Sequence, residues 1–278
     1  MEQTKSAGEI TLGKPEDGLW SKERILSRLE TVKLGRNVRV YDSVSSTNDI
    51  LAALAEKGEE EGLLVIAEEQ KTGRGRFRRK WFSPRGVGIW MSILLKPDIP
   101  AALAPGLSLV TSLAAAKAIR RTTGLSAFVK WPNDVLVSGK KVAGILTEME
   151  AEPGKVKFIV LGVGINVNQD DASLPGAIAA SSTSLSTELG QRVDRYEVLS
   201  SLLCELEPLY LTFCKSGLEP LLEEWKGMTE MWGRRISITC RGTVIEGVAH
   251  DVDESGALIV RLDSGVQERI LSGDVGFV

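Results

Sequence analysis

Residues 156 to 168, VKFIVLGVGINVN, alternate between two kinds of side chain, and this alternation constrains the fold more than any other stretch. Successive side chains of a β-strand point to opposite faces of the sheet. The apolar set therefore shares one face, which we expect to be core: Ile159, Leu161, Val163, Ile165 and Val167. The other face carries Gly162, Gly164 and Asn166. Because bare glycines weaken a strand unless something packs closely on them, we expect a ligand or another backbone segment to cover this face.

A second alternating strand, VGIWMSILLKP at residues 87 to 97, predicts a wall of the same site. Its presumed core face carries Ile89, Met91, Ile93 and Leu95, and its other face carries Gly88, Trp90, Ser92 and Leu94. A glycine, a hydroxyl and an indole on one face indicate a pocket wall, although a strand tryptophan is as often simple core. Apolar helices are predicted from Pro105 to about Thr122 and from about Tyr196 to Lys215, with a shorter one through Trp225, and these should cover the sheet.

The C-terminal part is predicted to form four short alternating strands after Gly233, separated by glycines: RRISITC, VIEGVAHDVD, ALIVRLD and VQERILS. This spacing predicts a small β-barrel. With about forty-five residues it is near the lower limit for independent folding, so we expect it to lean on the main domain. We therefore predict a flexible polar lead at residues 1–20, a main domain at 21–232 and a small β domain at 233–278.

The loop QKTGRGRFRRKW, residues 70 to 81, concentrates positive charge without a single acid. Gly73 and Gly75 let a ligand approach the backbone, so guanidinium groups and amides together suit a phosphate. Neither a GxxxxGK[ST] loop nor a complete dinucleotide fingerprint is present in the sequence. A solvated basic loop remains the alternative on this feature alone. The six cations are Lys71, Arg74, Arg76, Arg78, Arg79 and Lys80.

Other polar clusters stand where predicted strands and helices meet. The run SSTN at 45 to 48 precedes an apolar helix, so its side chains either cap that helix or bind a ligand, and the sequence leaves both open. Pro132 breaks the segment AFVKWPNDVLV, which places Asn133 and Asp134 in a turn. Such a turn is ordinarily structural, yet beside Lys130 and an indole it also suits a nucleotide base and a magnesium ion. Lys141 begins the next strand.

Composition excludes several classes of function. The chain has 34 Lys and Arg against 37 Asp and Glu, a formal net charge of −3, which argues against a general nucleic-acid or membrane binder. His250 is the single histidine and lies near the C-terminal end, which argues against a histidine-based triad and a histidine-rich metal site. Three cysteines without a CxxC pair favour a reducing, cytoplasmic setting. There is no apolar run long enough for a membrane span and no apolar leader, so we expect neither anchoring nor secretion.

Five motifs in order resemble the biotin protein ligases across roughly residues 36 to 278. They are SSTN at 45–48, QKTGRGRFRRKWFSP at 70–84, KWPNDVLV at 130–137, KKVAGIL at 140–146 and GVGINVN at 162–168. The resemblance implies an α+β fold with a central mixed sheet, packed helices and a small C-terminal SH3-like barrel. The related lipoate ligases share the general fold, so a lipoate-type acyl ligase is the nearest alternative.

The resemblance also implies a reaction and its participants. Biotin and MgATP give biotinyl-5′-AMP and pyrophosphate, and the acyl group then moves to one lysine of a biotin carboxyl carrier domain. Monomers and homodimers both occur among such enzymes, and Mg²⁺ is the expected metal. Since a biotin carboxylate is already ionised at neutral pH, the first step needs cations more than a base. This requirement agrees with the basic loop.

Site roles follow from the same resemblance. Arg74, Gly75 and Arg76 are expected to close over biotin and the adenylate, and Lys141 to neutralise the carboxylate and the reacting phosphate. The expected contacts to biotin are Ser46, Thr47, Asn48 and Gln70, with Gly144 allowing close approach and Trp90 and Ser92 forming the wall. The expected contacts to the nucleotide are Trp81 stacked on adenine, Asn133, Asn166, and Asp134 as a magnesium ligand.

The sequence departs from the family pattern in two ways, and one competing class of function stands beside the ligases. The sequence leaves no room for an N-terminal winged helix-turn-helix, so we expect a ligase without DNA binding. The chain ends SGDVGFV, without the terminal arginine that often contacts phosphate in such enzymes. The competing class is a non-enzymatic nucleic-acid-binding protein that uses the basic loop and the small barrel, but the acidic total charge disfavours it.

Overall fold

The computed structural model describes residues 19–153, 155–170, 174–240 and 242–278. Of the predicted lead at 1–20, residues 1–18 lie outside these ranges. Its last residue, Trp20, is only 5% exposed and belongs to the core, so the main domain begins earlier than predicted. Within the described ranges, no helix combines the length and the apolar character that crossing a bilayer requires.

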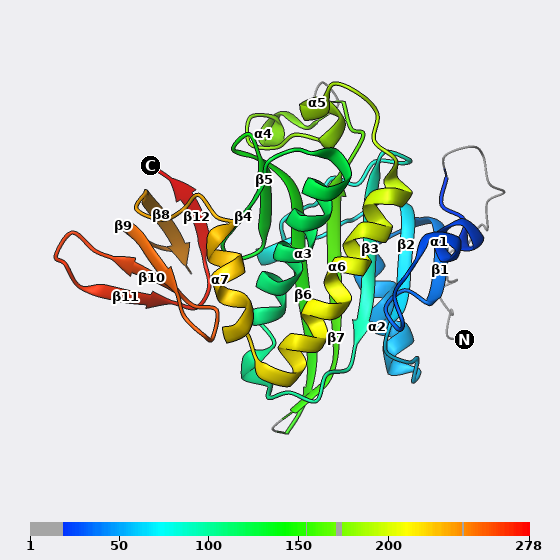
Figure 1. The fold of residues 1–278 in the computed structure, drawn as a ribbon, viewed down its shortest axis with the longest axis horizontal. Coiled ribbons are helices and arrows are strands. Elements are labelled where there is room, and N and C mark those ends of the chain that lie inside the picture. The colour runs from blue at the N-terminus through cyan, green and yellow to red at the C-terminus, as the bar shows by residue number, and fades with distance from the viewer. Residues whose placement is uncertain (1–18, 154, 171–173, 241) are drawn as a thin grey trace, which may run out of the picture.

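A seven-stranded mixed sheet forms the centre of the main domain (Figure 1). Its order is β1-β2-β3-β7-β6-β5-β4. The β1–β2 pair is parallel and the other neighbours are antiparallel. The strands are β1 Asn37–Val44, β2 Leu63–Gln70, β3 Gly88–Leu95, β4 Ala127–Lys130, β5 Asp134–Val137, β6 Lys140–Glu152 and β7 Lys155–Asn166.

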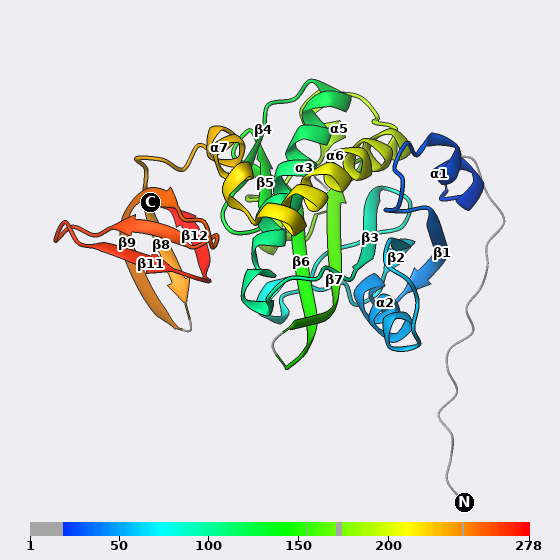
Figure 2. The same cartoon turned by 60° about the horizontal axis from the view of Figure 1, so that its bottom comes forward.

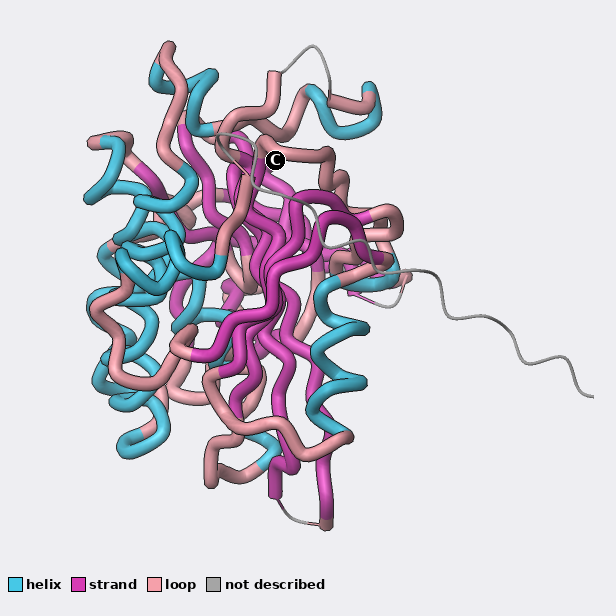
Figure 3. Tube along the Cα trace, turned by 90° about the vertical axis from the view of Figure 1, so that its right-hand side faces the viewer, coloured by secondary structure: helices cyan, strands magenta, loops and turns pink. Residues whose placement is uncertain are grey.

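Helices cover both faces of this sheet (Figure 3). The α3 and α6 helices pack on the face formed by the alternating apolar residues of β7, as predicted. On the opposite face α2 buries Leu51 and Ala55 against strand residues that include Leu94 and Val160. The helices are α1 Lys22–Arg28, α2 Thr47–Glu56, α3 Gly106–Thr123, α4 Gly176–Ala179, α5 Leu185–Leu189, α6 Arg195–Ser216 and α7 Glu219–Gly227, with short 3₁₀ turns at Arg76–Arg78 and Ala101–Leu103.

The C-terminal part is a five-stranded antiparallel sheet beside the main domain (Figure 2). Its order is β11-β10-β9-β8-β12, and among the described residues β11 and β12 do not pair, so the predicted barrel is an open sheet here. It leans on the main domain as expected, since Trp131 Nε1 donates to Gly256 O at 2.9 Å. Four strands were predicted and β12 was not. The strands are β8 Arg235–Cys240, β9 Thr243–Val252, β10 Leu258–Arg261, β11 Gln267–Ile270 and β12 Asp274–Phe277.

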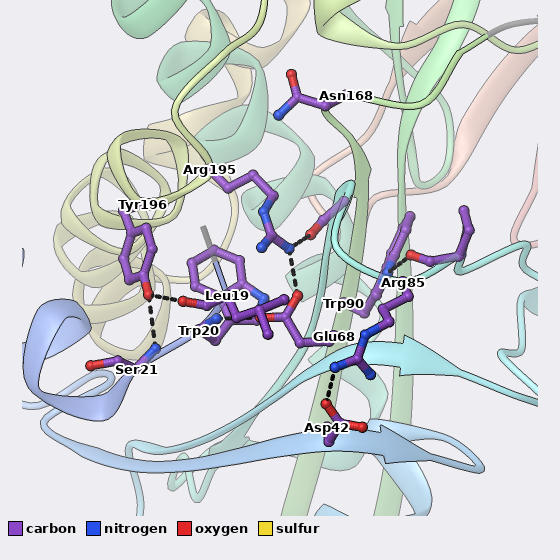
Figure 4. Close-up of polar contacts among 12 residues, drawn as sticks. Leu19, Trp20, Ser21, Asp42, Glu68, Arg85, Trp90, Asn168, Arg195 and Tyr196 are labelled. Atoms are coloured by element: carbon purple, nitrogen blue, oxygen red, sulfur yellow. Dashed lines mark hydrogen bonds and ion pairs between the residues drawn. The ribbon is translucent and has the colours of Figure 1, made fainter. Parts of the chain in front are cut away.

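A buried ion pair fastens the start of the described chain to the sheet (Figure 4). Arg195 Nη1 lies 3.0 Å from Glu68 Oε2 and donates to Gly88 O at 3.0 Å, which ties α6 to β2 and β3. The other Glu68 oxygen accepts the backbone N–H of Trp20. The Arg195 guanidinium also lies 4.5 Å from the centre of the Trp20 ring. Both charged side chains are at most 5% exposed, and among the described residues Arg195 is the cation that compensates the buried Glu68 carboxylate.

Candidate active site

A cavity of about 350 Å³ opens on the α2 side of the sheet. Its wall combines the start of α2, the basic loop, the β5–β6 hairpin, β7 and the C-terminal strand β12. Most of the predicted site residues meet here, although they come from segments far apart in the sequence. They are Ser46, Thr47, Asn48, Gln70, Arg74, Gly75, Arg76, Trp81, Asn133, Asp134, Lys141 and Gly144.

Three predicted site residues are absent from the lining among the described residues: Trp90, Ser92 and Asn166. Every residue of β3 is buried, and Trp90 turns back over its own strand so that its indole donates to Pro84 O at 3.1 Å. Asn166 donates to Thr183 O at 3.0 Å and accepts from Gln169 Nε2 at 2.9 Å. Alternation identified the face of each side chain, but neighbouring side chains decide whether that face reaches the cavity.

Side chains pack closely on the glycine face of β7, a cover that the sequence prediction of a ligand or a backbone segment did not include, and Gly162 and Gly164 also line the cavity. Asn48 lies where a Cβ on Gly162 would stand, and the indole of Trp81 lies over Gly164. Trp81 also reaches Gly144, where an added Cβ would be 3.0 Å from the ring. The glycines therefore make room for the binding residues themselves.

Ser46 and Thr47 stand at the start of α2, where Ser46 has the position of a capping residue. Ser46 occupies the N-cap position, but its side chain makes no capping hydrogen bond in the part of the chain that the structure describes. The Thr47 backbone N–H instead donates to Gln70 Oε1 at 2.8 Å. Ser46 and Thr47 both line the cavity, so the structure favours ligand binding over capping for this run.

Arginines of the basic loop form ion pairs with acidic residues of elements that are distant in the sequence. Arg74 Nη2 lies 2.6 Å from Asp49 of α2 and 3.1 Å from Glu148 of β6, while Arg79 pairs with Asp274 of β12. These pairs are partly exposed, so each contributes little to stability and is readily exchanged for another anion. Arg76 Nη1 lies 3.9 Å from Asp274 Oδ1, and no acid within the described residues forms an ion pair with the other three cations, which are exposed: Lys71, Arg78 and Lys80.

Arg76 joins the loop to two other parts of the wall. Its Nη1 donates to Asn133 Oδ1 at 3.2 Å and to Gly273 O at 3.1 Å. Burial lowers the pKa of its guanidinium, and Asp274 and Asp134 act in the opposite direction. The next residue, Phe77, has φ 55°, a left-handed conformation that is uncommon outside glycine. The loop thus bends sharply while Arg76 points into the cavity.

Lys141 faces Asp134 across the β5–β6 pair, with Nζ 2.5 Å from Oδ1. Its ammonium also lies 5.2 Å from the centre of the Trp81 ring, a cation–π arrangement. A register shift opposite Val135 and Leu136 gives β6 an extra residue, so Lys141 and Gly144 share one face although they are three positions apart. The bulge is what turns Lys141 into the cavity.

The donor set suits a magnesium ion only in company with a phosphate ligand. Asp134 Oδ1 is buried and has the Lys141 ammonium at 2.5 Å, so a metal ion bound to this carboxylate would share it with Lys141. The described residues contain no cluster of three or more His, Cys, Asp or Glu side chains placed to hold a metal. Magnesium in nucleotide sites is commonly held by one or two carboxylates plus phosphate oxygens, so one carboxylate beside a phosphate fits it.

The lining residues outside the predicted set of contacts include Lys130, Asp274 and Phe277. Lys130 lies in the motif KWPND, and burial lowers the pKa of its ammonium while Asp134 raises it. Asp274 and Phe277 come from the short strand β12, and the Phe277 ring lies 5.4 Å from Lys130 Nζ. The motif itself pointed to Lys130, whereas nothing in the sequence indicated that β12 would reach this cavity.

Comparisons with known proteins agree with this site. Residues 40–166 match the model of the Biotin/lipoate A/B protein ligase family, and residues 232–278 match the Biotin protein ligase C terminal domain. The bifunctional ligase/repressor BirA of Bacillus subtilis is 34% identical over 275 residues, covering 99% of this chain and 84% of that protein. The biotin–[acetyl-CoA-carboxylase] ligase of Mycobacterium tuberculosis is 36% identical over 252 residues, covering 86% and 88%.

A solved structure gives the same result for the fold. The biotin protein ligase from Aquifex aeolicus in complex with biotin and ATP superposes with a TM-score of 0.75 at 28% identity, covering 87% of this chain and 99% of that one. The motifs, the fold and both family models therefore agree, and the chain belongs to the biotin protein ligase family.

Proposed function

We propose that this protein attaches biotin to one lysine of a biotin carboxyl carrier domain. A biotin carboxylate oxygen attacks the α-phosphorus of ATP, the bond to the β-phosphate breaks, and pyrophosphate leaves. The lysine amine of the carrier then attacks the acyl carbon of biotinyl-AMP, loses a proton, and AMP leaves. The observation that carries this proposal is the convergence of Arg76, Lys130 and Lys141 on one cavity that Thr47 and Gln70 also line.

Cations perform most of the work in the first step, because the carboxylate and the triphosphate repel each other. Arg74 and Arg76 lie on a loop whose carboxylate partners are exchangeable, so phosphate oxygens can replace Asp49 and Asp274. Lys141 neutralises charge at the reacting phosphate. Mg²⁺, when bound, supplies further positive charge to the phosphates, and Asp134 would hold it.

In this proposal biotin and the nucleotide contact different residues of the cavity lining. Ser46, Thr47, Asn48 and Gln70 supply hydroxyl and amide groups for the biotin head, and Gly144 lets the ligand lie close to the backbone. At the other end Trp81 stacks on adenine, with Asn133 beside it. Trp90 and Ser92 contact this lining, since the Trp90 ring packs edge to face on Trp81 and Ser92 donates hydrogen bonds to Thr47 and Asn48.

The cellular setting follows from more general features. The names of the relatives in Mycobacterium tuberculosis and Paracoccus denitrificans specify biotin, which favours biotin over lipoate as the substrate. The cysteines are unpaired, which suits the cytoplasm. We further propose that the protein acts as a monomer or homodimer and that residues 19–278 do not bind DNA.

The test of this function is biotin-dependent exchange of labelled pyrophosphate into ATP. We expect exchange that requires both biotin and Mg²⁺, because only reversible formation of biotinyl-AMP returns pyrophosphate to ATP. Lipoate is the control substrate. Exchange that is absent with biotin, or equally rapid with lipoate, would overturn the assignment.

The basic loop should be cut by trypsin in the free protein and protected by ligand. Lys71, Arg78 and Lys80 are exposed, and the partly exposed ion pairs of Arg74 and Arg79 are weak and exchangeable. An anionic adenylate would bind these arginines and close the loop. Cleavage between Lys71 and Lys80 is followed by mass spectrometry, without ligand and with saturating biotin and MgATP. Identical cleavage rates would contradict closure.

Arg76→Gly should release biotinyl-AMP that the wild-type protein retains. The change removes the hydrogen bonds to Asn133 and Gly273 that fasten the loop over the cavity. A free acyl-adenylate reacts with any exposed amine, so bystander proteins in the reaction should become biotinylated. Avidin blotting with serum albumin present measures this. Arg78→Gly is the control, because Arg78 is exposed and outside the lining in the described structure.

A further inference from the structure

Lys130 is a half-buried cation of the cavity lining whose ammonium forms neither an ion pair nor a hydrogen bond with any described residue. The arginines of the lining and Lys141 have carboxylate partners, and Lys80, which has none among the described residues, is exposed to water. The Phe277 ring lies 5.4 Å from Lys130 Nζ. Burial lowers the pKa of this ammonium, and the attraction of Asp134 does not restore it. Because a buried ammonium without a counter-ion is costly, the position suits an anionic ligand.

Two acids act electrostatically on Lys130, but both are engaged by other cations. Lys130 stands opposite Asp134 in the β4–β5 pair, yet Asp134 Oδ1 lies 2.5 Å from Lys141 Nζ. Asp274 of β12 pairs with Arg79. An anion that binds Lys130 therefore does not have to displace a carboxylate from it.

The place of Lys130 in the sheet indicates which part of the substrates it meets. Gln70 ends β2, Lys141 lies at the start of β6, and Lys130 ends β4. Across the sheet, β2 is followed by β3, β7, β6, β5 and β4. In the proposed function Gln70 contacts biotin and Lys141 the reacting phosphate. Lys130 then lies beyond the reacting phosphate as seen from biotin.

The leaving group is the part of ATP expected at that place, because attacking and leaving oxygens are roughly in line in such transfers. The biotin carboxylate approaches the α-phosphorus from one side. On the opposite side the bond from the α-phosphorus to the bridging oxygen breaks, and negative charge grows on the β-phosphate. We propose that Lys130 binds the β- and γ-phosphates of ATP and the pyrophosphate that leaves. This inference rests on the proposed function and adds to it a residue for the leaving group.

Lys130→Met should lower the rate of biotinyl-AMP formation from biotin and ATP about a hundredfold, the scale of removing one electrostatic contact. Transfer of biotin from supplied biotinyl-AMP to the carrier domain should stay within about twofold of the wild-type rate, because pyrophosphate takes no part in that step. Lys130→Arg keeps the charge and should recover part of the first rate. Rapid-quench measurement follows the first step, and labelling of the carrier domain follows the second.

Arg234→Met is the matched control. The Arg234 guanidinium lies 3.7 Å from the centre of the same Phe277 ring, but this side chain is exposed and outside the cavity lining in the described structure. Both rates should therefore stay at the wild-type level. Thermal unfolding shows whether either variant is misfolded. Since Lys130→Met removes an uncompensated charge, its Tm should equal or exceed that of the wild-type protein.

Calorimetric titration with inorganic pyrophosphate and Mg²⁺ tests the contact without turnover. Lys130→Met should bind pyrophosphate about tenfold more weakly than the wild-type protein. Equal affinity, equal losses in the two steps, or the same loss in Arg234→Met would overturn the proposal. Pyrophosphate binding that depends on Lys130, in a wild-type protein without biotin-dependent exchange, would refute the proposed ligase function and leave the pyrophosphate site supported.

Discussion

Lys141→Ala should lower the single-turnover rate of biotinyl-AMP formation by about 10²- to 10³-fold, the scale of removing one preorganised electrostatic contact. The ammonium lies in the cavity, is 27% exposed, and is held by Asp134 at 2.5 Å and by the face of Trp81. It is therefore fixed where charge develops on the bridging oxygen and the leaving pyrophosphate. Because the contact is stronger in the transition state, the loss should fall on the rate more than on binding.

Two controls accompany this prediction. Lys141→Arg should recover only part of the rate, since a planar guanidinium does not replace a compact ammonium beside Gly144. Lys140→Ala should have a near-normal rate, because Lys140 is outside the cavity lining in the described structure. Rapid-quench measurement of biotinyl-AMP decides the outcome. Equal effects at the two lysines, or no effect at Lys141, would remove it from the catalytic residues.

Arg195→Met should destabilise the protein by about 3–5 kcal/mol, the cost of leaving one member of a buried ion pair without its counter-charge. In this variant the Glu68 carboxylate stays 3% exposed and keeps only the Trp20 N–H as a described hydrogen-bond donor. The start of the described chain, α6 and β2 would lose their shared contact (Figure 4). Chemical unfolding monitored by circular dichroism measures the change in free energy.

Arg235→Met is the matched control, because Arg235 pairs with Asp263 on the exposed surface of the C-terminal sheet. Solvent screens such pairs, so no measurable loss is expected. Changing Glu68 and Arg195 together to Met should recover most of the lost free energy of unfolding. In that variant no buried charge is left without a counter-charge. If the two single Arg→Met variants unfold alike, burial of the pair is not what stabilises this region.

The strands and long helices were predictable because their periodicities are local. The β7 alternation, the α3 and α6 helices and four of the five C-terminal strands lie close to the residues expected from the sequence. The motifs also identified most of the cavity lining. The fifth strand, β12, was not predicted, because two of its four residues, Asp274 and Gly276, are of types depleted in strands.

The acidic partners of the basic loop could be identified only from the tertiary structure. The loop at 70 to 81 has no acid of its own, yet Arg74 and Arg79 meet Asp49, Glu148 and Asp274 from three separate elements. A net charge of −3 gave no indication of where those acids lie. Local sequence determined that the loop is basic, and packing of α2, β6 and β12 around it determined that its arginines are compensated.

The sequence by itself determined the inventory of the site: the cationic loop, the hydroxyl and amide groups before α2, Lys141, and the glycines of β7. Only the tertiary structure decided how these groups are turned. A bulge in β6 brings Lys141 and Gly144 to one face, and the glycines receive Asn48 and Trp81. The physical reason is that periodicity specifies the face of a regular strand, whereas register shifts and the side chains that cover a face depend on contacts between segments distant in the chain.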